Sequence, residues 1–208
     1  MMFHRIVSFL LQYPDAGLRR ALPEIAIAIA GDDTLLPGER QTLAAFVENL
    51  VAADPTQAEA DYVATFDMVP EHSLHLTHHL LGEDRNRGPA LIDLGEFYRE
   101  YGLEISQREL PDYLPLILEF SSLLESEEAL LFLSRWTKVL RQLVANLEDV
   151  GSPYAPLVKL VETRSCLAEA GNATPVAAAT RSDPCLADGD FDPPVNWSAP
   201  PVGGACAG

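Results

Sequence analysis

The pattern of hydrophobic and polar positions is helical along most of the chain, up to about residue 164. Apolar residues return every three or four positions, as they do on the buried face of an amphipathic helix. The clearest stripes are Phe3, Ile6, Val7, Leu10 and Leu11; Leu43, Phe46, Val47, Leu50 and Val51; Leu91, Leu94, Phe97, Tyr98 and Tyr101; and Leu157, Leu160 and Val161. The longest stretch runs from about Ser126 to Val150 and predicts a single helix.

Local signals mark where several of these helices begin and end. Asp54-Pro55-Thr56-Gln57 is typical of a helix start, with a capping aspartate and proline in the first turn. Tyr62 and Phe66 then share one face of that helix, and Gly102 stands where a C-terminal cap is expected. Residues 25–30 alternate isoleucine with alanine as a strand does, but the helix propensity of alanine and the lack of a partner strand favour a helix. The sequence therefore predicts an all-α domain.

The composition changes at about residue 165. From there to Gly208 roughly half of the residues are Ala, Pro or Gly, and apolar periodicity is lost. Such a segment buries too little apolar surface to offset its ordering entropy, so we expect a mostly disordered tail. We therefore divide the chain into one all-helical bundle domain, residues 1–165, and a flexible acidic tail, residues 166–208.

The charge balance limits the classes of partner. The chain of 208 residues carries 31 acidic and 14 basic side chains, a net charge of −17. Nucleic acids and anionic membrane surfaces are negatively charged and would repel such a protein. The excess of acids favours a cationic partner, or merely a high solubility.

The distribution of apolar residues and cysteines points to the cytoplasm. No stretch reaches the roughly 18–20 apolar residues that cross a bilayer, and residues 1–13 are typical of a first core helix rather than a signal peptide. The three cysteines, Cys166, Cys185 and Cys206, all lie in the last fifth of the chain without CxxC spacing. An odd number in that position does not fit a secreted disulfide scaffold.

A histidine cluster is the most conspicuous candidate for chemistry. On a helix, His72, His75 and His79 would share one face, because steps of three and four residues return to the same side. Imidazoles so spaced bind zinc, which makes a metal-binding helical protein or a metal-dependent hydrolase the alternative function. No HExxH pattern, nearby cysteine or well-placed carboxylate completes the site. Ordinary packing of these side chains is the simpler interpretation.

Two further segments carry charged residues between helices. Gly82 to Pro89 is predicted to be a loop, in which Arg85 and Arg87 either hold an anion or pair with the neighbouring acids. In the segment Glu109 to Pro115, the acids suggest acid–base chemistry, but Pro111 and Asp112 also resemble a helix start. No serine has a histidine or an acid at a spacing that suggests a catalytic nucleophile and its base, so we predict that the protein is not an enzyme.

Taken in order, these segments resemble one known family. The shared motifs are Leu10-Leu11-x-Tyr13-Pro14-Asp15, Tyr62-x-x-x-Phe66-Asp67, Ser73-Leu74-x-Leu76-x-x-His79-x-x-Gly82, Arg87-Gly88-x-Ala90-x-x-x-Leu94, Tyr98-x-x-x-Gly102 and Glu109-Leu110-Pro111-Asp112-x-Leu114-Pro115-x-x-Leu118-Glu119-Phe120. Over roughly residues 3–165 the chain looks like the NarJ group, the nitrate reductase molybdenum cofactor assembly chaperones, within the TorD-like redox enzyme maturation proteins.

The resemblance implies a cytoplasmic chaperone without catalysis or a permanently bound cofactor. Members of the group bind the N-terminal segment of the apo catalytic subunit of a respiratory molybdoenzyme, by default nitrate reductase. They prevent premature docking with its membrane partner and assist molybdenum cofactor insertion. An acidic helical groove suits a basic amphipathic segment of this kind.

The resemblance also implies which residues form the groove. By family position, Arg87 and Gly88 and the stretch that includes Glu109, Asp112 and Pro115 should border it, shaping a hinge and presenting carboxylates to the peptide. Its apolar floor is expected to comprise Tyr62, Phe66, Leu114 and Leu118. Two departures stand out, since the group commonly has histidine where Tyr113 stands, and only His79 of the clustered histidines matches its pattern.

Overall fold

The computed structural model describes residues 2–106 and 109–171, with side chains up to residue 166. The predicted all-α fold is confirmed, because this part of the chain contains α-helices, one 3₁₀ helix and no strand. The elements are α1 (Met2–Leu10), α2 (Ala16–Gly31), α3 (Pro37–Ala52), α4 (Pro55–Phe66), η1 (Pro70–His72), α5 (Leu76–Leu81), α6 (Arg87–Glu100), α7 (Leu114–Leu123), α8 (Ser126–Ser134), α9 (Thr137–Asp149) and α10 (Ala155–Gly171). None of these helices is long and apolar enough to cross a bilayer.

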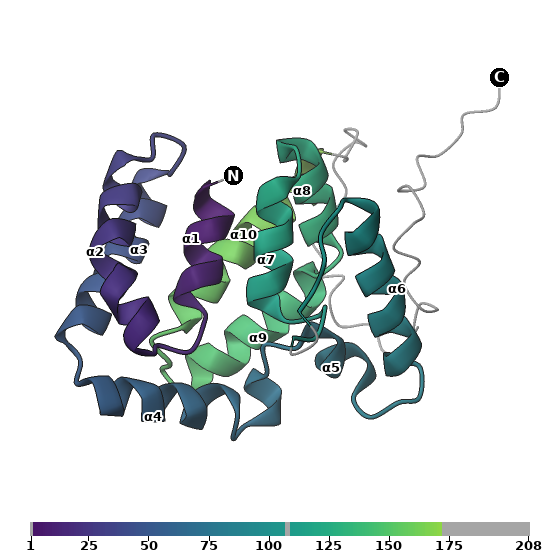
Figure 1. Cartoon of the computed structure of the whole chain (residues 1–208), viewed down its shortest axis with the longest axis horizontal. Helices are drawn as coiled ribbons and strands as arrows, with labels where there is room; N and C mark the ends of the chain where they lie inside the picture. Colours follow the sequence, from purple (N-terminus) through teal and green to yellow (C-terminus); the bar gives the residue numbers. More distant parts are fainter. Residues whose placement is uncertain (1, 107–108, 172–208) are drawn as a thin grey trace, which may run out of the picture.

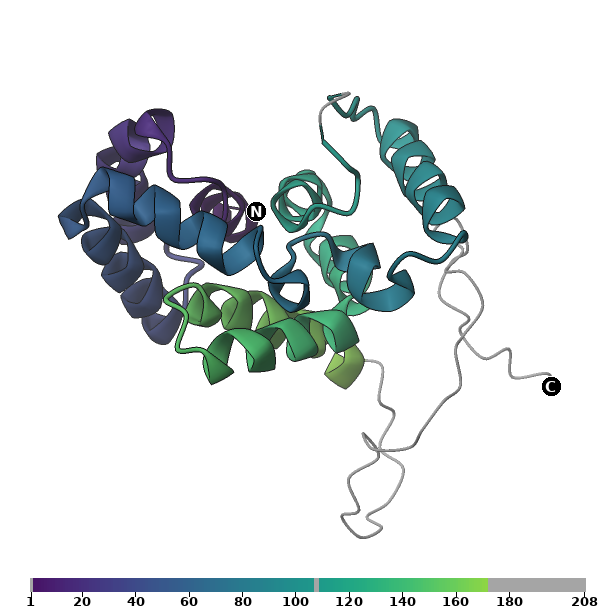
Figure 2. The ribbon, with the colours of Figure 1, turned by 90° about the horizontal axis from the view of Figure 1, so that it is seen from below.

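Helices from both ends of the described chain form the centre of the bundle (Figure 1). Helix α1 packs against α7, and α10 packs against α8, α9 and α3, while α2 lies on α3. Figure 1 shows α4 across the lower end of the bundle, and Figure 2 shows α6 at the periphery, away from α2 and α3. The hydrophobic stripes of these helices meet in one continuous core.

The N-terminal helix is buried as the first stripe predicts. Phe3, Val7 and Leu11 are fully inaccessible to solvent. Ser8 is buried among them and satisfies its hydroxyl by donating to the carbonyl of Pro115, 2.7 Å away. This bond joins the end of α1 to the start of α7, and it fixes the distance between two walls of the site described below.

The local start and stop signals are confirmed. The carboxylate of Asp54 accepts a hydrogen bond from the backbone N–H of Gln57 at 3.0 Å, so it caps α4. Gly102 follows α6 with φ of 79°, a left-handed conformation that glycine adopts without steric cost. Residues 25–30 lie within α2, as predicted.

The predicted single helix from Ser126 to Val150 is wrong, because the chain turns a corner between α8 and α9. The N–H of Trp136 donates to the carbonyl of Leu133 at 2.9 Å, which ends α8 in a tight turn. Trp136 is fully buried at this corner. Both helices bury one face against α10, so the apolar periodicity continues through the break and does not reveal it.

Two other boundaries differ from the sequence prediction. Helix α6 already begins at Arg87, so Gly88 and Pro89 belong to its first turn rather than to a loop. Proline is tolerated there because the N–H it lacks would have no helical acceptor. Helix α10 continues past residue 165 to Gly171. The predictions about residues 172–208, including Cys185 and Cys206, lie outside the described residues.

Candidate functional site

Two segments that are far apart in the sequence pair next to the start of α7. The N–H of Leu76 donates to the carbonyl of Asp112 at 3.0 Å, and the N–H of Leu114 donates to the carbonyl of Leu74 at 2.8 Å. These bonds form a short antiparallel bridge between His75 and Tyr113. The histidine segment and the acidic segment of the sequence therefore lie side by side.

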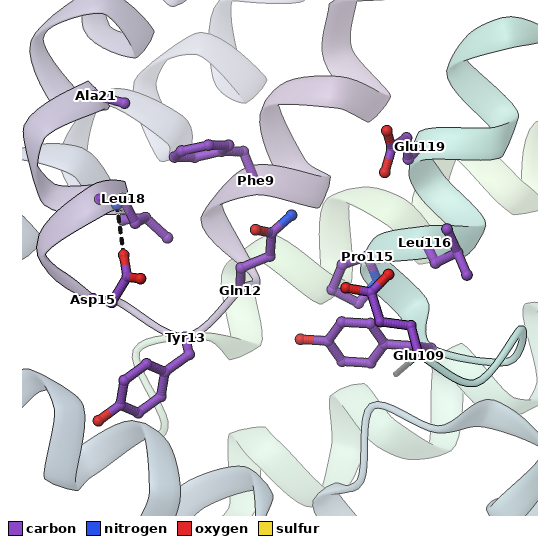
Figure 3. Close-up of a pocket in the computed structure, with 12 residues that line it drawn as sticks. Phe9, Gln12, Tyr13, Asp15, Leu18, Ala21, Glu109, Pro115, Leu116 and Glu119 are labelled. Atoms are coloured by element: carbon purple, nitrogen blue, oxygen red, sulfur yellow. Dashed lines mark hydrogen bonds between the residues drawn. The ribbon is translucent and has the colours of Figure 1, made fainter. Parts of the chain in front are cut away.

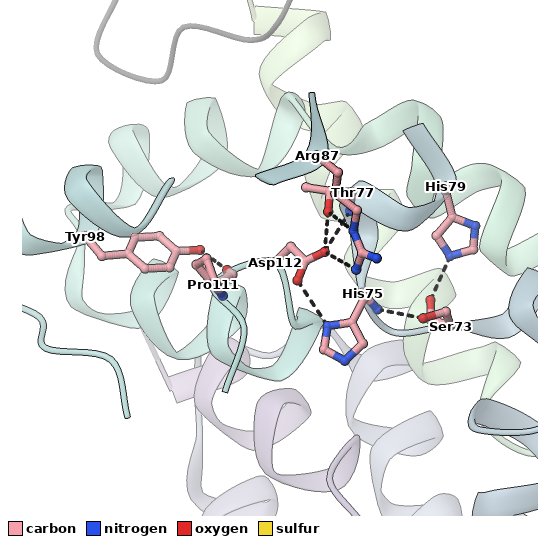
Figure 4. Close-up of polar contacts among 8 residues, drawn as sticks. All are labelled: Ser73, His75, Thr77, His79, Arg87, Tyr98, Pro111 and Asp112. Carbon is pink, nitrogen blue, oxygen red and sulfur yellow. Dashed lines mark hydrogen bonds and ion pairs between the residues drawn. The ribbon is translucent and has the colours of Figure 1, made fainter. Parts of the chain in front are cut away.

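Asp112 is the centre of this junction (Figure 4). Its side chain is fully buried, and Oδ1 lies 3.1 Å from Nδ1 of His75. Oδ2 accepts hydrogen bonds from the backbone N–H and the hydroxyl of Thr77, and it lies 3.6 Å from Nη2 of Arg87. Arg87 in turn donates from Nε to the Thr77 hydroxyl at 3.2 Å. One carboxylate thus connects α5, α6 and the segment before α7.

The surroundings of Asp112 keep it ionised. Burial alone would raise the pKa of this carboxyl, but the hydrogen bonds from His75 and Thr77 and the charge of Arg87 outweigh burial and lower it. Thr77 stands in the first turn of α5, so the Asp112 carboxylate accepts a hydrogen bond at the start of α5. The sequence predicted that Asp112 would instead start the helix that follows it in the chain. Helix α7 instead begins after Tyr113, without a side-chain cap.

A cleft of about 530 Å³ opens between α1, α2 and the start of α7 (Figure 3). We call it the main cleft; it is lined by Phe9, Gln12, Tyr13, Asp15, Gly17, Leu18, Ala21, Glu109, Tyr113, Pro115, Leu116 and Glu119. Figure 3 shows Glu109 and Glu119 on one side and Asp15 on the other. No lysine or arginine is among these lining residues, so the cleft combines an apolar surface with negative charge.

The local sequence explains the shape of this cleft. Pro14 separates α1 from α2, and Asp15 caps α2 by accepting from the N–H of Leu18 at 2.8 Å. The sharp turn between the two helices leaves the Tyr13 side chain 42% exposed at the mouth of the cleft. On the opposite wall, Pro115 occupies the first turn of α7.

A second cavity of about 220 Å³ adjoins the main cleft, and Tyr13 and Tyr113 line both. We call it the side chamber. Its other lining residues are Tyr62, Phe66, Asp67, Ser73, Leu74 and His75. Its walls therefore come from the α1–α2 turn, from the end of α4 and from the two paired segments.

Comparison with known proteins places the chain in a family. A family model described as nitrate reductase delta subunit matches residues 30–159, more than half of the chain. The chain belongs to this family. The resemblance to the NarJ group is thereby confirmed.

The chain is also similar to several proteins of known name. The chain is 40% identical over 156 residues to the nitrate reductase molybdenum cofactor assembly chaperone NarJ of Escherichia coli K12, covering 75% of this chain and 66% of the relative. It is 34% identical over 157 residues to the probable assembly chaperone NarJ of Bacillus subtilis, covering 74% and 83%. It is 32% identical over 154 residues to the nitrate reductase-like protein NarX of Mycobacterium tuberculosis, covering 74% and 23%. The chain thus spans just under two thirds of the length of the Escherichia coli relative, and both NarJ proteins are named as chaperones rather than enzymes.

The structure separates the residues expected around the groove into four groups. Glu109 and Pro115 line the main cleft, and Tyr62 and Phe66 line the side chamber. Leu114 and Leu118 are fully buried core residues that line neither cavity. The remaining three, Asp112, Arg87 and Gly88, also lie outside both linings.

Asp112 and Arg87 lie next to each other and line neither cavity. Asp112 has no exposed surface, so presentation of its carboxylate to a peptide does not fit this structure. Arg87 faces Asp112 and Thr77 rather than Glu83 or Asp84, the neighbours with which local pairing was considered. Both residues support the walls of the site from behind.

The histidines of this delta subunit family member do not share a helix face. His72 belongs to η1, His75 precedes α5 and His79 lies within α5, so the condition for a shared helix face, a single helix through all three residues, is not met. His72 Nδ1 lies 3.1 Å from the carbonyl of Thr65, and His79 donates from Nε2 to the carbonyl of Ser73 at 2.7 Å. The described residues contain no group of three or more His, Cys, Asp or Glu side chains arranged to hold a metal ion.

Several residues of the main cleft are absent from the sequence-based prediction. Phe9, Gln12, Tyr13 and Glu119 line it but were not among the expected site residues. The motif Leu10-Leu11-x-Tyr13-Pro14-Asp15 was an available signal, because it belongs to the family pattern and marks the α1–α2 turn.

Proposed function

We propose that this protein is a nitrate reductase assembly chaperone whose main cleft binds the N-terminal segment of the apo catalytic subunit. In this function it acts in the cytoplasm, keeps the client from docking with its membrane partner and assists insertion of the molybdenum cofactor. Family membership and the names of the NarJ relatives support the chaperone role. The geometry of the main cleft supports the mode of binding.

The observation that carries the proposal is the combination of surfaces in the main cleft. Phe9, Leu18 and Leu116 offer apolar contacts, while Asp15, Glu109 and Glu119 offer negative charge. An amphipathic segment binds such a groove by burying its apolar side chains and placing its basic side chains near the carboxylates. A segment with an acidic polar face would be repelled.

The paired segments hold one wall of the main cleft in place. Tyr113 directly follows Asp112, and Pro115 stands two residues further on; the contacts of Asp112 to His75, Thr77 and Arg87 fix the backbone at the start of this stretch. A preformed site loses less conformational entropy on binding than one that must first be ordered. The molybdenum cofactor is cargo for the client in this proposal, and the chaperone contributes by holding the client accessible.

A peptide-binding measurement tests the proposal. The full chain is titrated with a synthetic peptide of the N-terminal segment of the cognate nitrate reductase catalytic subunit, in a calorimeter and in a thermal melt. We expect a Kd of about 1 μM or lower and a rise in melting temperature, because a ligand that binds only the folded state stabilises it. A scrambled peptide of the same composition is the control. Absence of both heat and a thermal shift at saturating peptide contradicts the proposal.

A further inference from the structure

The walls of the side chamber are fixed by a chain of hydroxyl groups. The hydroxyl of Tyr62 lies 2.9 Å from the carbonyl of Leu11, to which it donates, and 3.2 Å from the hydroxyl of Tyr113. A phenol carries one proton, so Tyr113 must be the donor to Tyr62. The ring of Tyr13 packs edge-on against Tyr62 with centroids 5.5 Å apart. Three tyrosine rings are thereby held around one small cavity.

The wall of the side chamber formed by His75 is held by the buried Asp112. The His75 ring faces Tyr113 with centroids 5.3 Å apart and a tilt of 34°. Its Nδ1 is held by Asp112, so the ring cannot turn away without breaking that contact. The aromatic faces of the chamber are therefore preorganised rather than assembled on binding.

The chamber is also a region of negative potential. Asp67 lines the chamber. Burial is the largest cause of the raised pKa values of Tyr62 and Tyr113, and the negative charge of Asp67 raises both further. At the mouth, partial burial and then the charges of Glu59 and Asp15 raise the pKa of Tyr13. No lysine or arginine is among the residues that line the chamber.

We infer that the side chamber receives one arginine side chain of the segment bound in the main cleft. The inference rests on the proposed function and names the chemistry of one contact within it. Tyr13 and Tyr113 line both cavities, so the side chamber lies next to a segment that occupies the main cleft. A guanidinium is planar and weakly hydrated, so it stacks on tyrosine faces and pairs with a carboxylate better than an ammonium does. Asp67 supplies that carboxylate.

A citrulline scan of the peptide tests the inference. Citrulline has nearly the shape of arginine without its charge, so each arginine of the client peptide is replaced in turn and the Kd is measured. We expect one position at which citrulline weakens binding about tenfold, the effect of a partly desolvated cation–π contact together with an ion pair. In Asp67→Asn the same replacement should weaken binding less than about threefold. The exposed Asp33→Asn, on the loop between α2 and α3, is the matched control and should retain the tenfold effect.

The outcomes separate this inference from the function on which it rests. Asp67 is exposed, so we expect Asp67→Asn to fold, and a thermal melt of this variant checks that it does. If the unmodified peptide binds but no arginine is sensitive to citrulline, or if the sensitivity is unchanged in Asp67→Asn, the inference is overturned and the proposed function stands. If the unmodified peptide does not bind, both are overturned.

Discussion

At the scale of single residues, Asp112 shows how a buried charge becomes tolerable in this fold. Removal of a carboxylate from water costs several kcal/mol unless charge and hydrogen bonds replace the lost hydration. Here His75, Thr77 and Arg87 supply them, from the residue before α5, from α5 and from α6. Because these partners belong to separate elements, the carboxylate stabilises the arrangement of the elements and not only its own loop.

We expect Asp112→Asn to lower the free energy of unfolding by about 2–4 kcal/mol at pH 7, because the amide leaves Arg87 without its buried partner. The measurement is a urea unfolding curve, with Asp93→Asn, an exposed position on α6, as the control that should change stability by less than about 0.5 kcal/mol. Equal stability of the two variants contradicts the role given to Asp112.

The same carboxylate predicts a pH dependence with a definite sign. The folded-state pKa of Asp112 lies below its usual value, so near pH 4 the unfolded chain binds more protons than the folded chain. The stabilisation is therefore complete above the unfolded-state pKa and is lost as the pH falls through the lower, folded-state pKa. Unfolding curves between pH 7 and pH 3 should show the stabilities of wild type and Asp112→Asn converging toward acid pH. A difference that stays constant over that range contradicts this assignment.

At the scale of the elements, the sequence predicts what is determined locally. The Asp54 cap, the Gly102 stop and the apolar stripes depend on neighbours within about four residues. The structure confirms them, except that Val51 and Tyr101, the last residues of their stripes, are exposed. The corner at Trp136 is not visible locally, since the faces on both sides of it pack against α10. The pairing of residues 73–77 with residues 110–115 depends on contacts more than thirty positions apart, and no local spacing encodes it.

The same distinction applies to the site. Glu109 and Pro115 were predicted by family position and line the main cleft, whereas Leu114 and Leu118, two neighbours in the same motif, belong to the core. Along one helix, successive residues point in different directions, so a motif shared by a family mixes cleft and core positions. Only the packing of α7 against α1 decides which of these residues line the cleft and which belong to the core.

One contact between elements offers a sharp test of how α10 is attached. Arg164 on α10 makes two hydrogen bonds of 2.7 Å to the carboxylate of Glu39 on α3, and its guanidinium lies 3.7 Å from the ring centroid of Phe3 on α1. Both charged side chains are largely buried, at 14% and 9% exposure. Glu39 also accepts from the N–H of Leu36 at the start of α3.

We expect Arg164→Met to lower the free energy of unfolding by about 3 kcal/mol, because it leaves the Glu39 carboxylate buried without its cation. Arg141→Met is the matched control on the neighbouring helix, since Arg141 pairs with Glu162 at 3.4 Å but is 49% exposed. That change should cost less than about 0.5 kcal/mol in the same urea unfolding experiment. Comparable losses in the two variants contradict the role of the buried pair.

At the scale of the whole molecule, the structure shows where part of the net charge of −17 lies. Five acids and one base lie in residues 166–208, so most of the excess belongs to residues 1–165. Within that part, Asp15, Glu109 and Glu119 face the main cleft, and Asp67 faces the side chamber. A field of one sign over a groove raises the association rate of an oppositely charged ligand, and salt screens this effect over about 8–10 Å.

Charge reversal in the main cleft tests this steering. Glu109 and Glu119 are exposed, so Glu109→Lys and Glu119→Lys change the electrostatic field without burying a charge. Reversal at the fully buried Asp112 would bury a lysine and is therefore not used. We expect each to slow association of the client peptide about three- to tenfold at 20 mM salt and less than twofold at 500 mM salt, with the dissociation rate changed less. Stopped-flow measurements at the two salt concentrations give both rates. The exposed Glu24→Lys on α2, which does not line the cleft, should change neither rate by more than about twofold. An equal loss at low and high salt would mean that these glutamates act through short-range contacts in the complex, because screening removes only the part of their effect that operates across water.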